Sequence, residues 1–168
     1  TKTGHDNTAV GVVALGGFTS GERNTVMGRN AAQGTTSGSD NTAIGYDALY
    51  ANTTGYNNTC VGFESLEAVT TGFHNNGFGY EAGRLITTGE YNVGMGSVAL
   101  HSLTTGVRNT ALGYYAGGSS TTSAYGVYLG MEATASSATS SSEIVIGYTA
   151  VGKGTNTGFI NSSSGVYQ

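Results

Sequence analysis

Apolar and polar positions repeat along this chain with a constant step of 17 residues. In every unit an apolar residue stands directly before a glycine, and a small residue follows that glycine three positions later. The glycines of this column are Gly11, Gly28, Gly45, Gly62, Gly79, Gly96, Gly113, Gly130 and Gly147. These nine units follow one another without an insertion or a deletion. Such strict spacing indicates a solenoid, because one added residue would shift every stacked column.

Two further columns mark the corners of the expected coil. An asparagine stands four positions before the glycine in units one to seven, and a second glycine precedes that asparagine by three. Glycine is typical of corners with positive φ or close backbone approach, and stacked asparagine amides bond to the coils above and below. The residues that we assign to this structural role are Asn41, Gly45, Asn58, Gly62, Asn75, Gly79, Asn92, Gly96, Asn109 and Gly113.

A repeat of 17 residues is too short for a pair of helices, which needs about 33 residues or more. We therefore predict an all-β fold, a parallel β-solenoid of the β-roll or β-prism type, with two short strands in each coil. Coils that lie about 4.8 Å apart would stack into a rod roughly 40 Å tall. The solenoid domain covers residues 1–150, and residues 151–168 form a C-terminal tail or tip.

The thinness of the coil predicts more than one chain. Each coil offers about four core-facing apolar positions, worth roughly 2 kcal/mol each, whereas ordering each residue costs roughly 1.5 kcal/mol. Burial of one face against copies of the same chain is the simplest compensation. We therefore expect a homotrimer.

Composition removes several classes of protein. Gly supplies 29 of the 168 residues and Pro none, which favours β structure over helix. Six Lys and Arg residues against ten Asp and Glu residues leave no basic footprint for nucleic acid. No apolar run approaches the ~20 residues of a membrane-spanning helix. The start of the chain lacks an initiator Met and a signal-peptide pattern, so we read it as a fragment or processed product.

The segments Asn41–Leu49 and Asn109–Ala116 resemble the head repeats of YadA-type trimeric adhesins, which form a left-handed parallel β-roll in a trimer. The resemblance spans most of residues 7–150 and is specific in the Ala-Ile-Gly-x-x-Ala core. That family's common repeat is shorter, so the corner after Leu49 must be longer here. The Thr-Thr-Gly repeats also resemble those of bacteriophage tail fibres. The tail from Gly158 to Gln168 is similar to the stretch before the self-cleaving chaperone domain of many phage fibres.

No catalytic residue, metal site or cofactor is expected. The segment Gly147–Thr155 nearly spells a phosphate-binding loop, but Gly154 stands where Ser or Thr must follow the lysine. The single cysteine, Cys60, excludes an internal disulfide and is expected to be a small buried residue. The carboxylates Asp47, Glu64, Glu81 and Glu132 share one column, and we expect them to face solvent. The histidines His5, His74 and His101 lie at unlike repeat positions.

The 11 tyrosines carry the binding hypothesis. We expect Tyr46, Tyr80, Tyr114 and Tyr148 to point inward as structural residues. Others lie near corners beside Asn and Thr, where a ring stacks on the apolar face of a sugar while amides and hydroxyls bond to its hydroxyls. The predicted receptor-binding residues are Tyr56, Tyr91, Tyr125 and Tyr167.

These observations together predict a phage tail-fibre protein, part of the virion, that attaches to a polysaccharide or glycan of the bacterial surface. Three identical faces would sum weak sites into avidity. The alternative is the head of a bacterial trimeric autotransporter adhesin, on the cell surface, that binds host extracellular matrix. Ice binding is disfavoured because neighbouring threonines point to opposite faces of a strand, and a depolymerising enzyme because no carboxylate cleft is apparent. The expected partners are copies of the same chain and the glycan, without nucleic acid or membrane.

Overall fold

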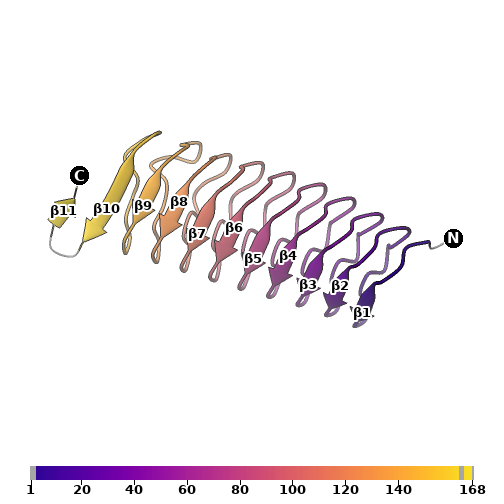
Figure 1. Ribbon diagram of the computed structural model, residues 1–168. Coiled ribbons are helices and arrows are strands. Elements are labelled where there is room, and N and C mark those ends of the chain that lie inside the picture. Colours follow the sequence, from indigo (N-terminus) through magenta and orange to yellow (C-terminus); the bar gives the residue numbers. More distant parts are fainter. Residues whose placement is uncertain (1–2, 163–164, 168) are drawn as a thin grey trace.

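The computed structural model describes residues 3–162 and 165–167. It is an all-β solenoid whose coils stack along one axis, with the two ends of the chain at opposite ends of the stack (Figure 1). The strands are β1 (Thr8–Val10), β2 (Thr25–Met27), β3 (Thr42–Ile44), β4 (Thr59–Val61), β5 (Asn76–Phe78), β6 (Val93–Met95), β7 (Thr110–Leu112), β8 (Val127–Leu129), β9 (Ile144–Ile146), β10 (Gly158–Ser162) and β11 (Gly165–Tyr167).

The strands form one sheet in sequence order. Strands β1 to β10 pair in parallel, and β11 turns back to pair antiparallel with β10. The register advances by one repeat at each step, so that Thr42 lies opposite Thr25 on one side and opposite Thr59 on the other. The predicted parallel β-solenoid of about nine 17-residue coils is therefore confirmed.

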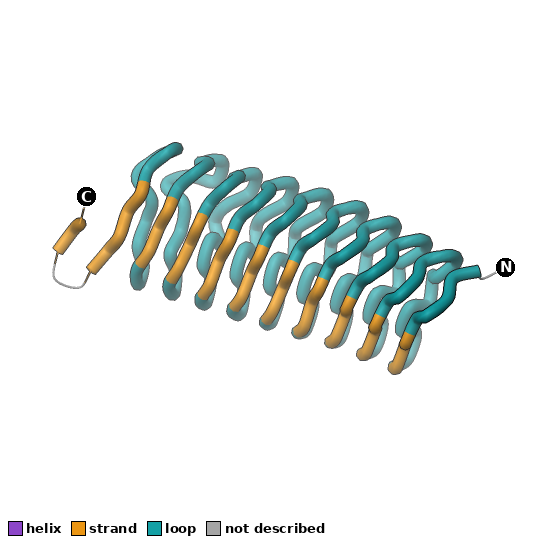
Figure 2. The backbone as a smooth tube through the Cα atoms, viewed as in Figure 1, coloured by secondary structure: helices purple, strands orange, loops and turns teal. Residues whose placement is uncertain are grey.

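Each of these coils contains one strand of three residues, so the prediction of two strands per coil is wrong (Figure 2). The reason lies in the backbone of the turns. In the fourth coil Asn57, Glu64 and Leu66 have φ values of 53°, 51° and 52°. A residue in this left-handed region cannot continue a strand. The three positions therefore divide the rest of the coil into turns.

The glycine that follows each strand is required by the geometry of the turn. Gly79 has a φ of 135°, and a Cβ atom built there would lie 2.6 Å from the carbonyl oxygen of Gly96 in the next coil. Side chains rarely adopt such a φ, and the neighbouring backbone leaves no space for one. The strand therefore ends at this glycine in each of the nine coils.

The core is a narrow column inside the coil. The middle residue of each strand points inward and is small in most coils, as at Ala43, Cys60 and Ala111. Gly77 shows why, because a Cβ atom there would lie 2.6 Å from the Oγ of Ser65. Larger apolar side chains fill the rest of the core from the turns, and the biggest of these are Leu49, Leu66, Ile86, Leu100 and Leu103.

A ladder of asparagine side chains runs through the core from Asn7 to Asn109. In the middle of the ladder, Nδ2 of Asn75 donates to Oδ1 of Asn58 at 3.2 Å and to the carbonyl oxygen of Gly89 at 2.8 Å. The backbone N–H of Asn75 also donates to Oδ1 of Asn58, at 3.0 Å. Each amide inside the ladder thus finds partners in the coils on both sides, which offsets the cost of burying it.

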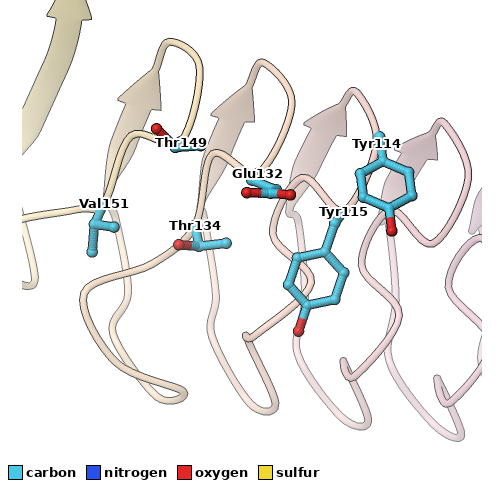
Figure 3. A pocket seen from close by; sticks show the side chains of 6 residues that line it. All are labelled: Tyr114, Tyr115, Glu132, Thr134, Thr149 and Val151. Atoms are coloured by element: carbon cyan, nitrogen blue, oxygen red, sulfur yellow. The ribbon is translucent and has the colours of Figure 1, made fainter.

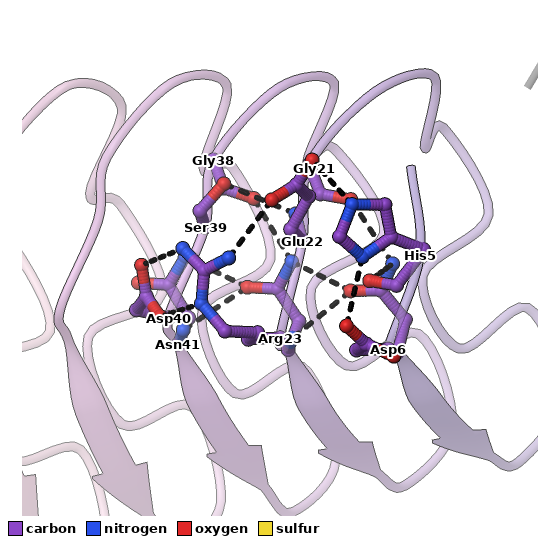
Figure 4. Close-up of polar contacts among 11 residues, drawn as sticks. His5, Asp6, Gly21, Glu22, Arg23, Gly38, Ser39, Asp40 and Asn41 are labelled. Atoms are coloured by element: carbon purple, nitrogen blue, oxygen red, sulfur yellow. Dashed lines mark hydrogen bonds and ion pairs between the residues drawn. The ribbon is translucent and has the colours of Figure 1, made fainter. Parts of the chain in front are cut away.

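Charged side chains form a second ladder at the surface near the N-terminal end (Figure 4). Arg23 donates from Nε to Oδ1 of Asp40 in the next coil at 2.6 Å and from Nη1 to Glu22 at 2.8 Å. The other carboxylate oxygen of Glu22 lies 2.9 Å from Nε2 of His5. These groups are largely exposed, so water screens the pairs and they contribute little to stability.

One side of the solenoid, which we call the strand face, is exposed and uncharged, with a row of polar and apolar residues beside a row of apolar ones. It consists of the first and third residues of β1 to β9, and none of these residues is charged. The third residues form a continuous apolar row: Val10, Met27, Ile44, Val61, Phe78, Met95, Leu112, Leu129 and Ile146. Several of them are about half exposed, including Met27 at 50% and Leu112 at 53%.

The aromatic residues that follow the glycine also face solvent, so the prediction that they point inward is wrong. Tyr46 is 40% exposed and Tyr148 is 67% exposed. The carboxylates that were expected outside are the more buried set, with side-chain exposures of 17% for Glu64 and 14% for Glu81. Alternation of side chains holds only along a continuous strand, and the bend at the glycine interrupts it.

The last coils close the stack differently. Glu143 occupies the position of the asparagine ladder and is fully buried. Its Oε1 accepts the N–H of Gly154 at 2.6 Å and its Oε2 accepts the N–H of Ser136 at 3.0 Å. Ile144 of β9 pairs with Gly158 of β10, so the step between these strands is shorter than the repeat. Strand β10, within the predicted tail 151–168, thus continues the sheet.

Candidate functional site

A hollow of about 460 Å³ opens beside the turns that follow β7, β8 and β9 (Figure 3). The residues that line it are Tyr114, Tyr115, Glu132, Thr134, Thr149 and Val151. Its volume lies in the range of about 300–1,000 Å³ that is usual for sites of small ligands. We call this feature the hollow and treat it as the candidate binding site.

Three of the lining residues occupy the same repeat position in successive coils. Tyr115, Glu132 and Thr149 have φ values of 53°, 57° and 49°, so each adopts the same left-handed turn. The backbone N–H of Glu132 donates to the carbonyl oxygen of Tyr114 in the coil before, at 2.8 Å. The three side chains are therefore held about 4.8 Å apart along the axis.

The hollow exists because the repeat position of Thr134 and Val151, which is buried in earlier coils, lies at the surface at this end of the solenoid. In earlier coils the corresponding position is a buried left-handed residue, as at Leu66 and Leu100. Thr134 and Val151 lack that conformation, pair with each other in a parallel bridge, and remain on the surface, where Val151 is 49% exposed. The side chains of Thr134 and Val151 thus stay out of the core and line the hollow.

Gly118 makes room for the ring of Tyr115. A Cβ atom at Gly118 would lie 2.6 Å from two carbons of that ring. The same repeat position holds Arg84 and His101 in earlier coils. The ring of Tyr115 therefore occupies the space that a side chain at position 118 would fill, and it also lines the hollow.

The hollow presents two aromatic rings, one carboxylate and two threonine side chains. Figure 3 shows the rings of Tyr114 and Tyr115 broadside, and within the described residues neither ring stacks on another aromatic ring. The carboxylate of Glu132 forms no ion pair with any described residue. Flat ring faces contact the C–H groups of a sugar, while a free carboxylate and threonine hydroxyls bond to its hydroxyl groups.

A second group of residues, which we call the corner column, is mostly aromatic and lies at the two positions before the asparagines or, in the eighth unit, before Gly126. Its members are Tyr56, Phe73, His74, Tyr91, Arg108 and Tyr125. Tyr56 stacks on Phe73 with centroids 4.8 Å apart, and His74 stacks on Tyr91 at 4.9 Å. The structure thus brings three of the predicted receptor-binding residues, Tyr56, Tyr91 and Tyr125, to one edge of the solenoid.

Stacking along the axis limits what the corner column offers to a sugar. A ring between two neighbours has both faces covered, so it presents its edge and its hydroxyl group to solvent. The same holds for Phe63, which stacks between Tyr46 and Tyr80 at 5.2 and 5.3 Å. The fourth predicted residue, Tyr167, belongs to β11, and its side chain lies outside the described part of the chain.

The half-buried carboxylates form a salt-bridged cluster. Nε of Arg84 lies 3.0 Å from Glu64 and 2.7 Å from Glu67, and Nε2 of His101 lies 3.1 Å from Glu81. Burial raises the pKa of Glu64, and the charge of Arg84 opposes that shift. One arginine thus pairs with two carboxylates and His101 contacts the third, and these mutual contacts favour a structural role over acid–base chemistry.

Other sequence features also take structural places. Within the described residues no group of His, Cys, Asp and Glu is arranged to hold a metal ion. Cys60 is buried, and burial raises the pKa of its thiol. Lys153 of the near phosphate-binding loop lies over the ring of Phe159, with Nζ 4.7 Å from its centroid. The described chain contains no helix with the length and hydropathy of a membrane-spanning segment.

Comparisons with protein families, with curated proteins and with solved structures gave no match. The hollow was missed by sequence reasoning, which assigned Tyr114 to the core and Glu132 to a solvated column. The signal was the change of the core column from leucine to Thr134 and Val151 near the end of the repeats.

Proposed function

We propose that this protein is an attachment module that binds a glycan of a cell surface through the hollow. The observation that carries the proposal is the pair of unstacked tyrosine rings, Tyr114 and Tyr115, beside the unpaired carboxylate of Glu132. Aromatic faces with a few convergent polar groups are the usual composition of a sugar-binding surface. The rest of the solenoid then acts as a rigid shaft that holds this site at a fixed distance.

We further propose that three copies associate through the strand face. Supporting this, the face carries a continuous apolar row, lacks charged residues and repeats every coil, so a parallel copy matches it layer for layer. Nine strands spaced about 4.8 Å apart, each about 10 Å long, give the strand face an area of about 400 Å². The neighbouring aromatic residues, such as Tyr46 and Tyr80, extend this area toward the ~800 Å² per partner of a stable interface.

A trimer would give the attachment module its strength. Three hollows on one rigid body convert weak single-site binding into avidity, provided that the surface polymer repeats its unit. This arrangement supports a place in a phage tail fibre that recognises a bacterial polysaccharide. The runner-up, the head of a bacterial adhesin, would use the same trimer but bind a protein of the host matrix.

The binding proposal is tested with an array of bacterial polysaccharide fragments, followed by calorimetry with the best neutral oligosaccharide. We expect Tyr115→Ala to weaken binding by about tenfold, the value of one aromatic contact. Tyr50→Ala is the matched control, because Tyr50 is exposed but does not line the hollow and lies outside the strand face. Absence of glycan binding, or equal losses in both variants, would refute the proposal. Binding to collagen-type matrix proteins instead would favour the adhesin alternative.

The trimer is tested by sedimentation equilibrium. Phe78→Glu places a charge on the strand face and is expected to shift the mass from three copies toward one. Thr105→Glu places the same charge on an exposed corner away from the strands and is expected to leave the mass unchanged. A monomeric wild-type protein at micromolar concentration would contradict the trimer without bearing on the hollow.

A further inference from the structure

Arg108 is held between two tyrosine rings of the corner column. Its guanidinium carbon lies 5.4 Å from the ring centroid of Tyr91 and 5.6 Å from that of Tyr125. Its Nη1 also donates to the hydroxyl group of Tyr125 at 3.0 Å. A long side chain that is otherwise free to rotate is thus fixed in one place at the surface.

The charge of Arg108 is not neutralised. Arg23 and Arg84 both pair with carboxylates, whereas no carboxylate of the described residues forms an ion pair with Arg108. Glu90 is the nearest acid along this edge, since its carbonyl oxygen accepts the backbone N–H of Arg108 at 2.9 Å, but its side chain forms no ion pair. The chain has a net charge of −4, yet Arg108 has no carboxylate partner within the described residues. Its guanidinium is therefore available to an external anion.

The geometry suits a flat, two-oxygen anion. A guanidinium carries five N–H donors in a planar fork that matches a carboxylate or a phosphate. One donor bonds to Tyr125, and within the described residues the remaining donors of the fork form no ion pair, so they are offered to a ligand. Because the side chain is already ordered, binding avoids the loss of side-chain entropy that would accompany the ordering of a mobile arginine.

The surroundings of Arg108 add polar groups from neighbouring coils. His74 stacks on Tyr91, and the corner column continues to Tyr56. The groups packed against the same edge are Glu90 and Ser142, from the adjoining repeat positions, and of these Glu90 alone carries a negative charge. The edge therefore combines a fixed cation with hydroxyl and ring-nitrogen groups that suit a charged sugar.

We propose that the corner column binds an anionic group of the surface polymer, a carboxylate or a phosphate, with Arg108 as the residue that contacts it. That the anion belongs to a surface polymer rests on the proposed attachment function. That the site binds an anion rests on the geometry of Arg108, Tyr91 and Tyr125. This site is separate from the hollow, whose own charged group, Glu132, would repel an anion.

The inference is tested by calorimetry with three probes: a hexuronic acid oligosaccharide, a glucose phosphate and a neutral oligosaccharide. The first two arms distinguish a carboxylate from a phosphate. We expect Arg108→Gln to weaken binding of the preferred anion by about tenfold, the value of one charge-assisted pair. Arg29→Gln is the matched control, because Arg29 lies over a single ring at 6.0 Å and also lacks an ion pair. Its affinity should stay at the wild-type value.

Two further variants separate the role of Arg108 from general electrostatics. Arg108→Lys keeps the charge but loses the fork, and it should lose most of the affinity that Arg108→Gln loses. Glu90→Gln removes the one nearby negative charge and should tighten binding two- to threefold at low salt. No binding of either anion, or equal losses in Arg108→Gln and Arg29→Gln, would overturn the inference.

The neutral oligosaccharide keeps this inference distinct from the proposed function. If it binds through Tyr115 while neither anion binds, the attachment function stands and the anion site falls. If an anion binds through Arg108 while no neutral glycan binds, the anion site stands and the role of the hollow falls.

Discussion

Truncation of one asparagine in the middle of the core ladder should cost a large fraction of the stability of the fold. Asn75→Ala removes four hydrogen bonds: Nδ2 to Asn58 at 3.2 Å, Nδ2 to Gly89 at 2.8 Å, and two from Asn92 to Oδ1 at 3.2 and 3.0 Å. At about 1 kcal/mol for each bond, the expected loss is about 4 kcal/mol. The carbonyl of Gly89 and the N–H of Asn92 would be left without these partners, so the true loss should not fall below this value.

The first rung of the ladder provides the control. Asn7 makes the same kinds of bonds, to Gly21 at 3.0 Å and from Asn24 at 2.9 Å, but it is partly exposed. Water can replace its lost bonds, so Asn7→Ala should cost only about 1 kcal/mol.

Urea unfolding followed by circular dichroism, at one protein concentration because association shifts the midpoint, measures both variants. Hydrogen exchange then shows whether the opening starts at the mutated coil. Equal losses for Asn75→Ala and Asn7→Ala, both near 1 kcal/mol, would refute the idea that the buried ladder holds the coils together.

Three other predictions follow from single positions. Burial raises the pKa of Cys60 from an ordinary value of 9.0, so only the unfolded thiol ionises above that pH. Stability should therefore fall by up to about 1.4 kcal/mol per pH unit as pH rises past 9, and Cys60→Ala should remove this slope in urea titrations between pH 8 and 11. Gly118→Ala should displace the ring of Tyr115 and reduce glycan affinity by about tenfold with an unchanged circular dichroism spectrum; unaltered affinity would mean that the ring is not the contact. Gly79→Ala should destabilise by more than about 3 kcal/mol, because its Cβ atom meets backbone at 2.6 Å, whereas Gly154→Ala has a similar φ but open space and should cost less in thermal melts.

The sequence was sufficient for the coil because the solenoid imposes one constraint that spacing alone reveals. Each residue must lie over its equivalent in the next coil, so Thr42 must face Thr25 and Thr59, and a period of 17 without exceptions satisfies this condition. The number of strands per coil was beyond such reasoning. It depends on residues such as Glu64 and Leu66 adopting positive φ, which nothing in their chemistry requires.

Side-chain directions failed for a related reason. The expectation that Tyr46 points inward assumed that alternation continues through Gly45. That glycine has a φ of 140°, which turns the chain, so Ile44 and Tyr46 both lie at the surface on either side of it. The consequence reaches the candidate site, because the same shift places Tyr114 beside the hollow instead of in the core. Three of the four predicted corner tyrosines are gathered at one edge, but their stacking could not be read from spacing.

Both candidate sites lie where a column changes its type of residue, and this has a physical reason. In an unbroken column each side chain covers the next, as the rings of Tyr46, Phe63 and Tyr80 do, so little is left to contact a ligand. Where Thr134 takes the place of a buried leucine, the column opens into a hollow. Where Arg108 enters the aromatic corner column, a charge is held without a partner. The regular columns thus supply the rigidity that sites need, while the exceptions supply the chemistry.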